Sequence, residues 1–159
     1  MEAKEYVQRL KEISLKKLTL VDEILLFVRS QNEVIKGQRL EEMDSLLKEK
    51  QKRMDAVDKL DEQFTVYSSR LKDILSISSF EDLPKFGLPG TQELKTIVES
   101  IHQKLQAIKE IDDGNITLVK AEMKDLKEKM NNNSAHKRVQ GAYYPTQSSG
   151  TSHYFDTKK

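Results

Sequence analysis

Hydrophobic side chains recur at helical spacing along the first part of the chain. Between residues 3 and 36 they return every three or four positions and widen into a broad stripe toward the middle of the range. The positions are Val7, Leu10, Ile13, Leu18, Leu20, Val21, Ile24, Leu25, Phe27 and Val28. The pattern predicts a helix over 3–36 that buries one broad face. Gly37 follows the cationic Lys36, which is typical of a helix that ends in a left-handed C-cap at the glycine.

A second run with the same period predicts a helix over 39–75. Its apolar positions alternate three and four residues apart, as in a heptad seam. Lys50 falls where an apolar residue is due and three-residue steps follow it, so the seam departs from a regular two-stranded zipper. Because the connection around Gly37 is only a few residues long, the second helix should fold back antiparallel to the first.

The pattern breaks over 76–91, where Pro and Gly residues cluster, and this range is the main internal connection. Within it, Ser78 and Glu81 have the spacing of a capping box, which predicts one short helical turn that ends before Pro84. A third amphipathic helix is predicted over 92–130. The group Asp112–Asn115 consists of poor helix formers and is interpreted as an interruption or kink in this helix.

These segments predict an all-α fold, an elongated antiparallel bundle of three long helices formed by a helical hairpin and a third helix. The bundle domain covers residues 1–130, and each helix should extend ~50 Å. Residues 131–159 are polar and carry no apolar stripe, which predicts a flexible tail. The tail nevertheless holds four aromatic residues, which suggests that it binds a partner. They are Tyr143, Tyr144, Tyr154 and Phe155.

Composition and charge narrow the range of partners. Charged residues make up 33% of the chain and aromatic residues 6%, a balance that favours long helices over a sheet-rich fold. The 27 Lys and Arg residues against 26 Asp and Glu give a net charge of +1, which offers no basic field for nucleic acid. The longest apolar run, Ile24–Val28, is far too short for membrane insertion. The lack of Cys and of a secretory pattern in the first residues favours a cytoplasmic location.

No arrangement of residues predicts catalysis, a cofactor or a metal site. The three histidines lie far apart in sequence and share no metal-ligand spacing with a second ligand. Carboxylate pairs such as Glu41–Glu42 and Asp112–Asp113 lie in strongly charged stretches, with no apolar pocket nearby in sequence that would raise a carboxyl pKa. We therefore expect a protein that acts by binding and is not an enzyme.

The end of the third helix is the predicted binding surface. Short connections leave no fourth helix to cover the apolar face of this segment completely, and the aromatic tail follows it directly. The residues on this face are Ile116, Val119, Met123, Leu126 and Met130.

Several segments together resemble the FlgN family, the type III export chaperones of the flagellar hook-associated proteins. They are the Leu-rich first helix up to Glu33, LLKEKQKRMDAVDKLDEQF in the second helix, IKEIDDGNITLVKAEMKDLKEKM in the third and the ending HKRVQGAYYPTQSSGTSHYFDTKK. In the ending, a basic stretch, the pair Ala142–Tyr143, a polar spacer and Phe155–Asp156 follow the order found in the family.

The resemblance implies a cytosolic chaperone that holds hook-associated proteins unpolymerised and delivers them to the cytoplasmic domain of the flagellar export gate. Client binding would belong to the surface formed by Ile116, Val119, Met123, Leu126 and Met130, and gate docking to Tyr143 or Tyr144. The alternative interpretation is a structural or scaffolding coiled coil that self-associates through its heptad faces; a strictly monomeric species in sedimentation would contradict it.

Overall fold

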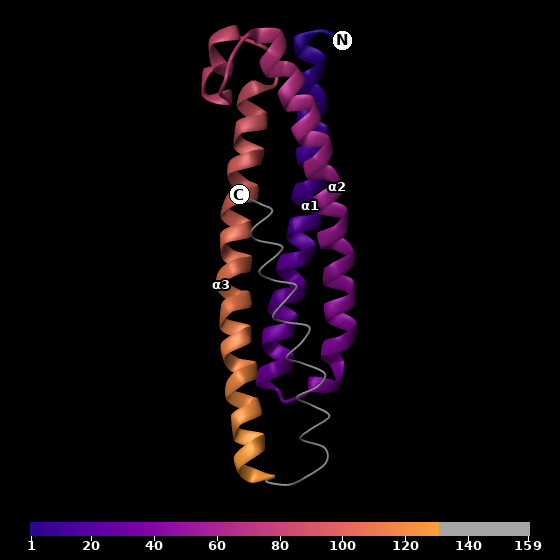
Figure 1. The fold of residues 1–159 in the computed structure, drawn as a ribbon, viewed down its shortest axis with the longest axis vertical. Coiled ribbons are helices and arrows are strands. Elements are labelled where there is room, and N and C mark those ends of the chain that lie inside the picture. The colour runs from indigo at the N-terminus through magenta and orange to yellow at the C-terminus, as the bar shows by residue number, and fades with distance from the viewer. Residues whose placement is uncertain (131–159) are drawn as a thin grey trace.

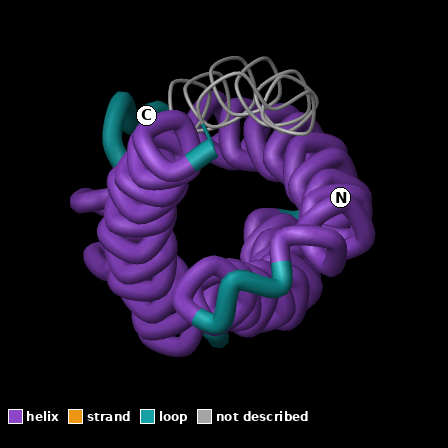
Figure 2. The backbone as a smooth tube through the Cα atoms, turned by 90° about the horizontal axis from the view of Figure 1, so that it is seen from below, coloured by secondary structure: helices purple, strands orange, loops and turns teal. Residues whose placement is uncertain are grey.

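The computed structural model describes residues 1–130, and these residues form helices joined by short connections (Figures 1 and 2). The three long helices are α1 (Ala3–Lys36), α2 (Met43–Leu75) and α3 (Thr91–Lys129), with the 3₁₀ helices η1 (Leu40–Glu42) and η2 (Phe80–Phe86) between them. The predicted all-α bundle of three long helices is confirmed. The predicted flexible tail, 131–159, lies outside the described residues.

Helix α1 is the central helix of the bundle. It packs along its length against both α2 and α3, whereas the backbones of α2 and α3 approach each other much less closely. Consecutive helices run in opposite directions, so α1 and α3 are parallel (Figure 1). Their register is visible in the ion pair between Lys11 and Glu93 at 2.7 Å near one end and in the pair Lys104–Asp22 midway. The end of α3 projects past the α1–α2 turn (Figure 1).

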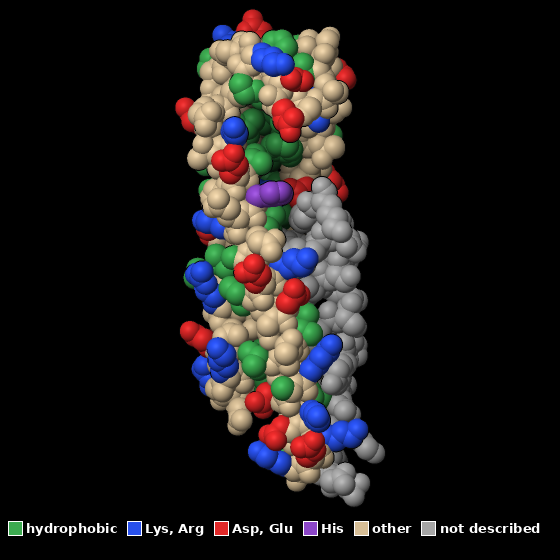
Figure 3. All heavy atoms as spheres, turned by 90° about the vertical axis from the view of Figure 1, so that its left-hand side faces the viewer, with side chains coloured by type: hydrophobic (Ala, Val, Ile, Leu, Met, Phe, Trp, Pro, Cys, Tyr) green, Lys and Arg blue, Asp and Glu red, His purple; other side chains and the backbone are tan. Residues whose placement is uncertain are grey.

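Buried apolar side chains form three separate clusters along the rod. The middle one, the central cluster, contains fully buried residues of all three helices, and complete burial of each such side chain stabilises the fold by about 1.5–3 kcal/mol. Its members are Val21, Ile24, Leu25, Val28, Met54, Val57, Ile101 and Ile108. A second cluster lies under η2, where hydrophobic side chains also gather on the α3 face of the surface (Figure 3). The third lies at the α1–α2 turn.

The C-terminal end of α1 differs from the prediction by one residue. Gly37 has φ −81°, and the left-handed residue is Gln38 with φ 55°. The N–H of Arg39 donates to the carbonyl of Val34, and the N–H of Gln38 to that of Ile35, the two bonds of a Schellman motif. The tight reversal was therefore predicted correctly, but Gly37 is the last residue before the left-handed position.

The short helix in the connection also differs from its prediction. Ser79, and not Ser78, is the N-cap, since its Oγ accepts the N–H of Glu81 at 3.2 Å. The helix then continues through Pro84 as a 3₁₀ helix, whose φ matches the value that the proline ring imposes. Leu83 is buried beneath it and joins the cluster at this end of the bundle.

Candidate interaction surface at the end of α3

The residues predicted to form the binding surface all lie at the end of α3 but differ in accessibility. Val119 and Met123 are buried, with 3% and 2% of their surface exposed. Ile116 and Leu126 are half-buried, and Met130, which follows the helix, is 37% exposed. The accessible part of the surface thus consists of Ile116, Leu126 and Met130. Tyr143 and Tyr144 lie outside the described residues.

Val119 and Met123 are covered by the α1–α2 turn, which takes part of the role of a fourth helix. They form the third apolar cluster, here called the distal cluster, whose other members come from the end of α1 and the start of α2. Its buried residues are Val34, Ile35, Met43, Val119 and Met123, with Leu40, Leu46 and Leu118 packed around them. The apolar face of this segment is therefore covered in its first half and open toward its end.

A layer of buried polar side chains lies between the central and distal clusters. Lys50 of α2 donates to Gln31 Oε1 of α1 at 3.3 Å and to Asp112 Oδ1 of α3 at 3.2 Å. Next to it, Asn115 Nδ2 donates to the Val28 carbonyl at 3.0 Å, and its Oδ1 accepts the amide of Asn32 at 3.0 Å. Gln31, Lys50, Asp112 and Asn115 are all buried, and we call these four residues the polar layer.

The structure corrects two predictions about Asp112: that its group interrupts the third helix, and that nothing nearby would raise the pKa of its carboxyl. Helix α3 is continuous from Thr91 to Lys129, so the predicted interruption at Asp112–Asn115 is wrong. The group stays helical because the side chains of Asp112 and Asn115 bond to α1 and α2 and so do not compete for their own backbone. Burial raises the pKa of the Asp112 carboxyl; attraction to Lys50 lowers it in part, and the neighbouring Asp113 adds to the rise.

Gly114 lies inside this group, on the exposed side of α3. A Cβ built there would meet no described side chain or distant backbone atom within 4 Å. The glycine is therefore not required by close packing, and its effect is on helix stability, which it lowers by about 1 kcal/mol relative to alanine.

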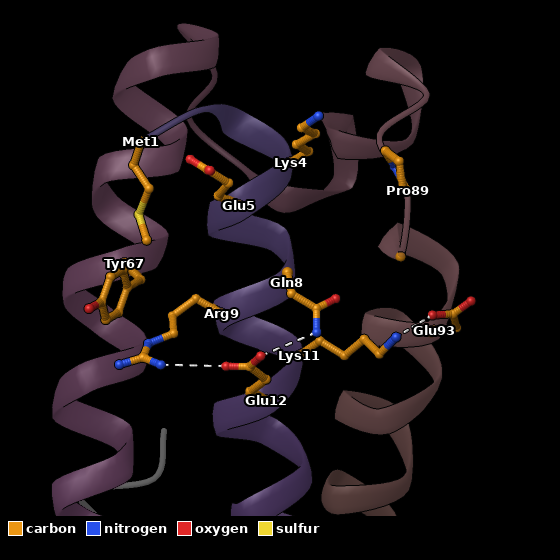
Figure 4. Close-up of a pocket in the computed structure, with 11 residues that line it drawn as sticks. Met1, Lys4, Glu5, Gln8, Arg9, Lys11, Glu12, Tyr67, Pro89 and Glu93 are labelled. Carbon is orange, nitrogen blue, oxygen red and sulfur yellow. Dashed lines mark hydrogen bonds and ion pairs between the residues drawn. The ribbon is translucent and has the colours of Figure 1, made fainter.

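At the opposite end of the rod, an open depression of about 730 Å³ lies between α1, α2 and the start of α3 (Figure 4). Four of its charged side chains pair with one another: Arg9 with Glu12 at 3.5 Å and Lys11 with Glu93 at 2.7 Å. Arg9 also lies over the ring of Tyr67, 5.7 Å from the centroid. This mutual pairing stabilises the helix ends and does not direct polar groups at a common point, as a catalytic site requires.

Metal binding and membrane insertion each require a recognisable arrangement of residues, for which residues 1–130 can be assessed. Among these residues, no group of three or more His, Cys, Asp or Glu side chains is placed to hold a metal ion. Each helix in the same range is too short or too polar to cross a membrane.

The described structure is an elongated bundle of three long helices, and the apolar side chains that remain accessible include those at the end of α3. A comparison with protein families finds that the family described as FlgN protein matches residues 1–150. The chain belongs to the FlgN family, and its general role is that of a flagellar export chaperone. Comparisons with curated proteins and with solved structures gave no match.

Proposed function

We propose that the chain binds hook-associated flagellar proteins in the cytoplasm through the end of α3, prevents their premature assembly and delivers them to the export gate. The observation that carries this proposal is the position of Ile116, Leu126 and Met130. These apolar residues remain at least partly accessible along the last part of α3, whose end projects past the α1–α2 turn, and FlgN membership gives the general chaperone role.

The physical basis is the covering of one amphipathic helix by another. Flagellar axial proteins assemble through amphipathic helical surfaces, and a chaperone helix that presents a complementary apolar stripe hides those surfaces from other copies. The accessible stripe is short, with Met130 at its end, so each contact contributes modestly and the client can be released at the gate.

A pair of matched substitutions tests the client surface. Met130 and Val98 are 37% and 38% exposed, and they lie at opposite ends of α3. Met130→Asp should weaken binding of a purified hook-associated protein at least tenfold, because the carboxylate loses water in an apolar interface without a partner. Val98→Asp should leave binding unchanged. Calorimetry on both variants, with circular dichroism to verify folding, would contradict the proposal if the two affinities were equal.

The proposed docking of the tail at the gate has its own test. Tyr143 and Tyr144 are assigned this role by the family resemblance, and tyrosine suits it because its ring is apolar and its hydroxyl polar. Tyr143→Ala combined with Tyr144→Ala should preserve client binding and reduce retention on the immobilised cytoplasmic domain of the gate. Tyr154→Ala is the matched control in the same tail. Loss of client binding in the double variant, or equal retention for all variants, would refute this division of roles.

A further inference from the structure

Two of the five residues of the candidate surface are inaccessible in the described structure. Val119 and Met123 are buried against Val34, Ile35 and Met43, so a partner helix cannot touch them while α3 keeps its place. The segment that carries them, residues 116–129, is called here the distal segment. Its attachment to the rest of the bundle determines whether these side chains ever reach a partner.

Among the described residues, the distal segment lacks the ion pairs to α1 that hold the preceding part of α3. Upstream of the polar layer, Glu93 and Lys104 pair with Lys11 and Asp22 of α1. Each part of α3 contributes two buried side chains to its apolar cluster, Ile101 and Ile108 upstream and Val119 and Met123 downstream. The hydrogen bond from Thr117 to the Asp113 carbonyl and the ion pair between Lys129 and Asp125 both stay within α3. The distal segment is thus held to α1 and α2 mainly by Val119 and Met123.

The helix is also at its weakest where the distal segment begins. Asp112, Asp113, Gly114 and Asn115 are four consecutive poor helix formers in the interior of a 39-residue helix. Alanine would fit at Gly114 without any displacement of described atoms, yet glycine stands there. Weak intrinsic helicity therefore coincides with the boundary between the two apolar clusters, so a bend there would open the distal cluster and leave the central cluster in place.

We propose that α3 hinges at Asp112–Asn115, and that movement of the distal segment uncovers an apolar socket on the α1–α2 turn for an amphipathic helix of the client. The socket consists of Val34, Ile35 and Met43. Its present occupant defines the kind of partner: Val119 and Met123 are spaced i, i+4 on one helix face, so the incoming helix presents two apolar side chains one turn apart. The identity of the partner as a client rests on the proposed function; the hinge itself does not.

The hinge can be tested on the chain alone, because it contains no Cys and accepts single reporters. Met123→Cys and Ile108→Cys are matched, with native side chains 2% and 1% exposed on the same helix. Under native conditions a thiol reagent should label Met123→Cys at least tenfold faster than Ile108→Cys, after correction for the measured stability of each variant. Hydrogen exchange of the unmodified chain should show the same boundary, with lower protection after Asn115.

A second substitution locates the hinge. Gly114→Ala should slow the labelling of Met123→Cys about fivefold, the factor that corresponds to about 1 kcal/mol of helix stability. Thr96→Ala is the control, since Thr96 is exposed and its hydroxyl donates to the Gln92 carbonyl within α3. Because Thr96 and Ile108 lie on the same side of the hinge, Thr96→Ala should slow the labelling of Ile108→Cys. It should leave the labelling rate of Met123→Cys unchanged. Equal labelling of both reporters, equal protection along α3, or an effect of Thr96→Ala at Met123→Cys would overturn the hinge.

Client affinity then connects the hinge to binding. If the client helix binds the open form, Gly114→Ala should raise the apparent dissociation constant of a hook-associated protein about fivefold, because the open form becomes rarer by that factor. Thr96→Ala should not change it. An unchanged affinity in Gly114→Ala would overturn the socket. Absence of binding to the unmodified chain would instead contradict the proposed function, while the labelling results would still decide the hinge.

Discussion

The buried ion pair between Lys50 and Asp112 makes the strongest prediction about stability. Its two side chains are each 10% exposed, and their charged atoms lie 3.2 Å apart. The informative variants are Lys50→Met, Asp112→Leu and the two combined, since these apolar side chains remove the charges while still filling the layer. The free energy of unfolding of each variant, measured with urea, shows how the pair acts.

The expected values follow from two opposing quantities. At 3.2 Å and an effective dielectric constant of about 20, the attraction between the charges is about 5 kcal/mol. Removing each charge from water costs several kcal/mol, so the intact pair contributes a net free energy near zero. When one partner is removed, the free-energy cost of burying the other charge is no longer compensated by their attraction. Each single variant should therefore be destabilised by about 3–5 kcal/mol, and the double variant should lie within about 2 kcal/mol of the unmodified chain.

The pH dependence separates the two single variants. The pKa of Asp112 is already raised by burial, and removal of Lys50 takes away the attraction that lowers it, so it rises further in Lys50→Met. A carboxyl whose pKa is higher in the folded than in the unfolded state destabilises the fold when ionised. This penalty is full above the folded pKa and disappears below the unfolded value of about 3.9. The deficit of Lys50→Met should shrink as the pH falls from about 7 to 4.

Asp112→Leu is the control for this measurement, because it lacks the carboxyl and its deficit should show no such recovery on acidification. Urea titrations at each pH, followed by circular dichroism, compare every variant with the unmodified chain under the same conditions. A deficit below about 1 kcal/mol for both single variants, or a double variant that loses the sum of the two, would refute the account of the polar layer.

Four further substitutions have expected outcomes. Leu10→Ala should cost about 2–5 kcal/mol in urea denaturation because Leu10 is fully buried, whereas Leu26→Ala, at 61% exposed, should stay within about 0.5 kcal/mol. Gly90→Ala should lower the thermal midpoint by the equivalent of about 1–2 kcal/mol, since Gly90 has φ +86°; no change would mean that the backbone relaxes. Asn115→Ala should cost about 1–3 kcal/mol in urea because the Asn32 amide and the Val28 carbonyl lose their partner; an unchanged midpoint would show that water replaces it.

The helices were predictable from the sequence because their signal is local. Apolar residues at three- and four-residue intervals identify a buried face without knowledge of what covers it. Helix ends were less predictable, since a cap depends on the φ of single residues: Gln38 adopts the left-handed conformation next to a glycine, and Ser79 caps η2 next to Ser78.

The polar layer was missed because its members are far apart in sequence. Asp112 lies 62 residues from Lys50, and each was interpreted separately, one as a helix interruption and one as an irregularity of the seam. A signal did exist: Ile108, Asp112, Asn115 and Val119 follow the four–three–four spacing of a seam, so two polar residues occupy core positions. Polar residues at core positions of two different helices predict a buried contact between them, but the register of the helices decides which ones meet.

The separations in sequence also order the folding of the chain during its synthesis. Contacts between α1 and α2 begin with pairs such as Gln31 and Lys50, only 19 residues apart, so the hairpin can close soon after it leaves the ribosome. The α1–α3 contacts join residues 82–87 positions apart and must wait for α3 to be made. Until then the second face of α1 has no cover, and the nascent hairpin passes through an interval in which it is prone to aggregation.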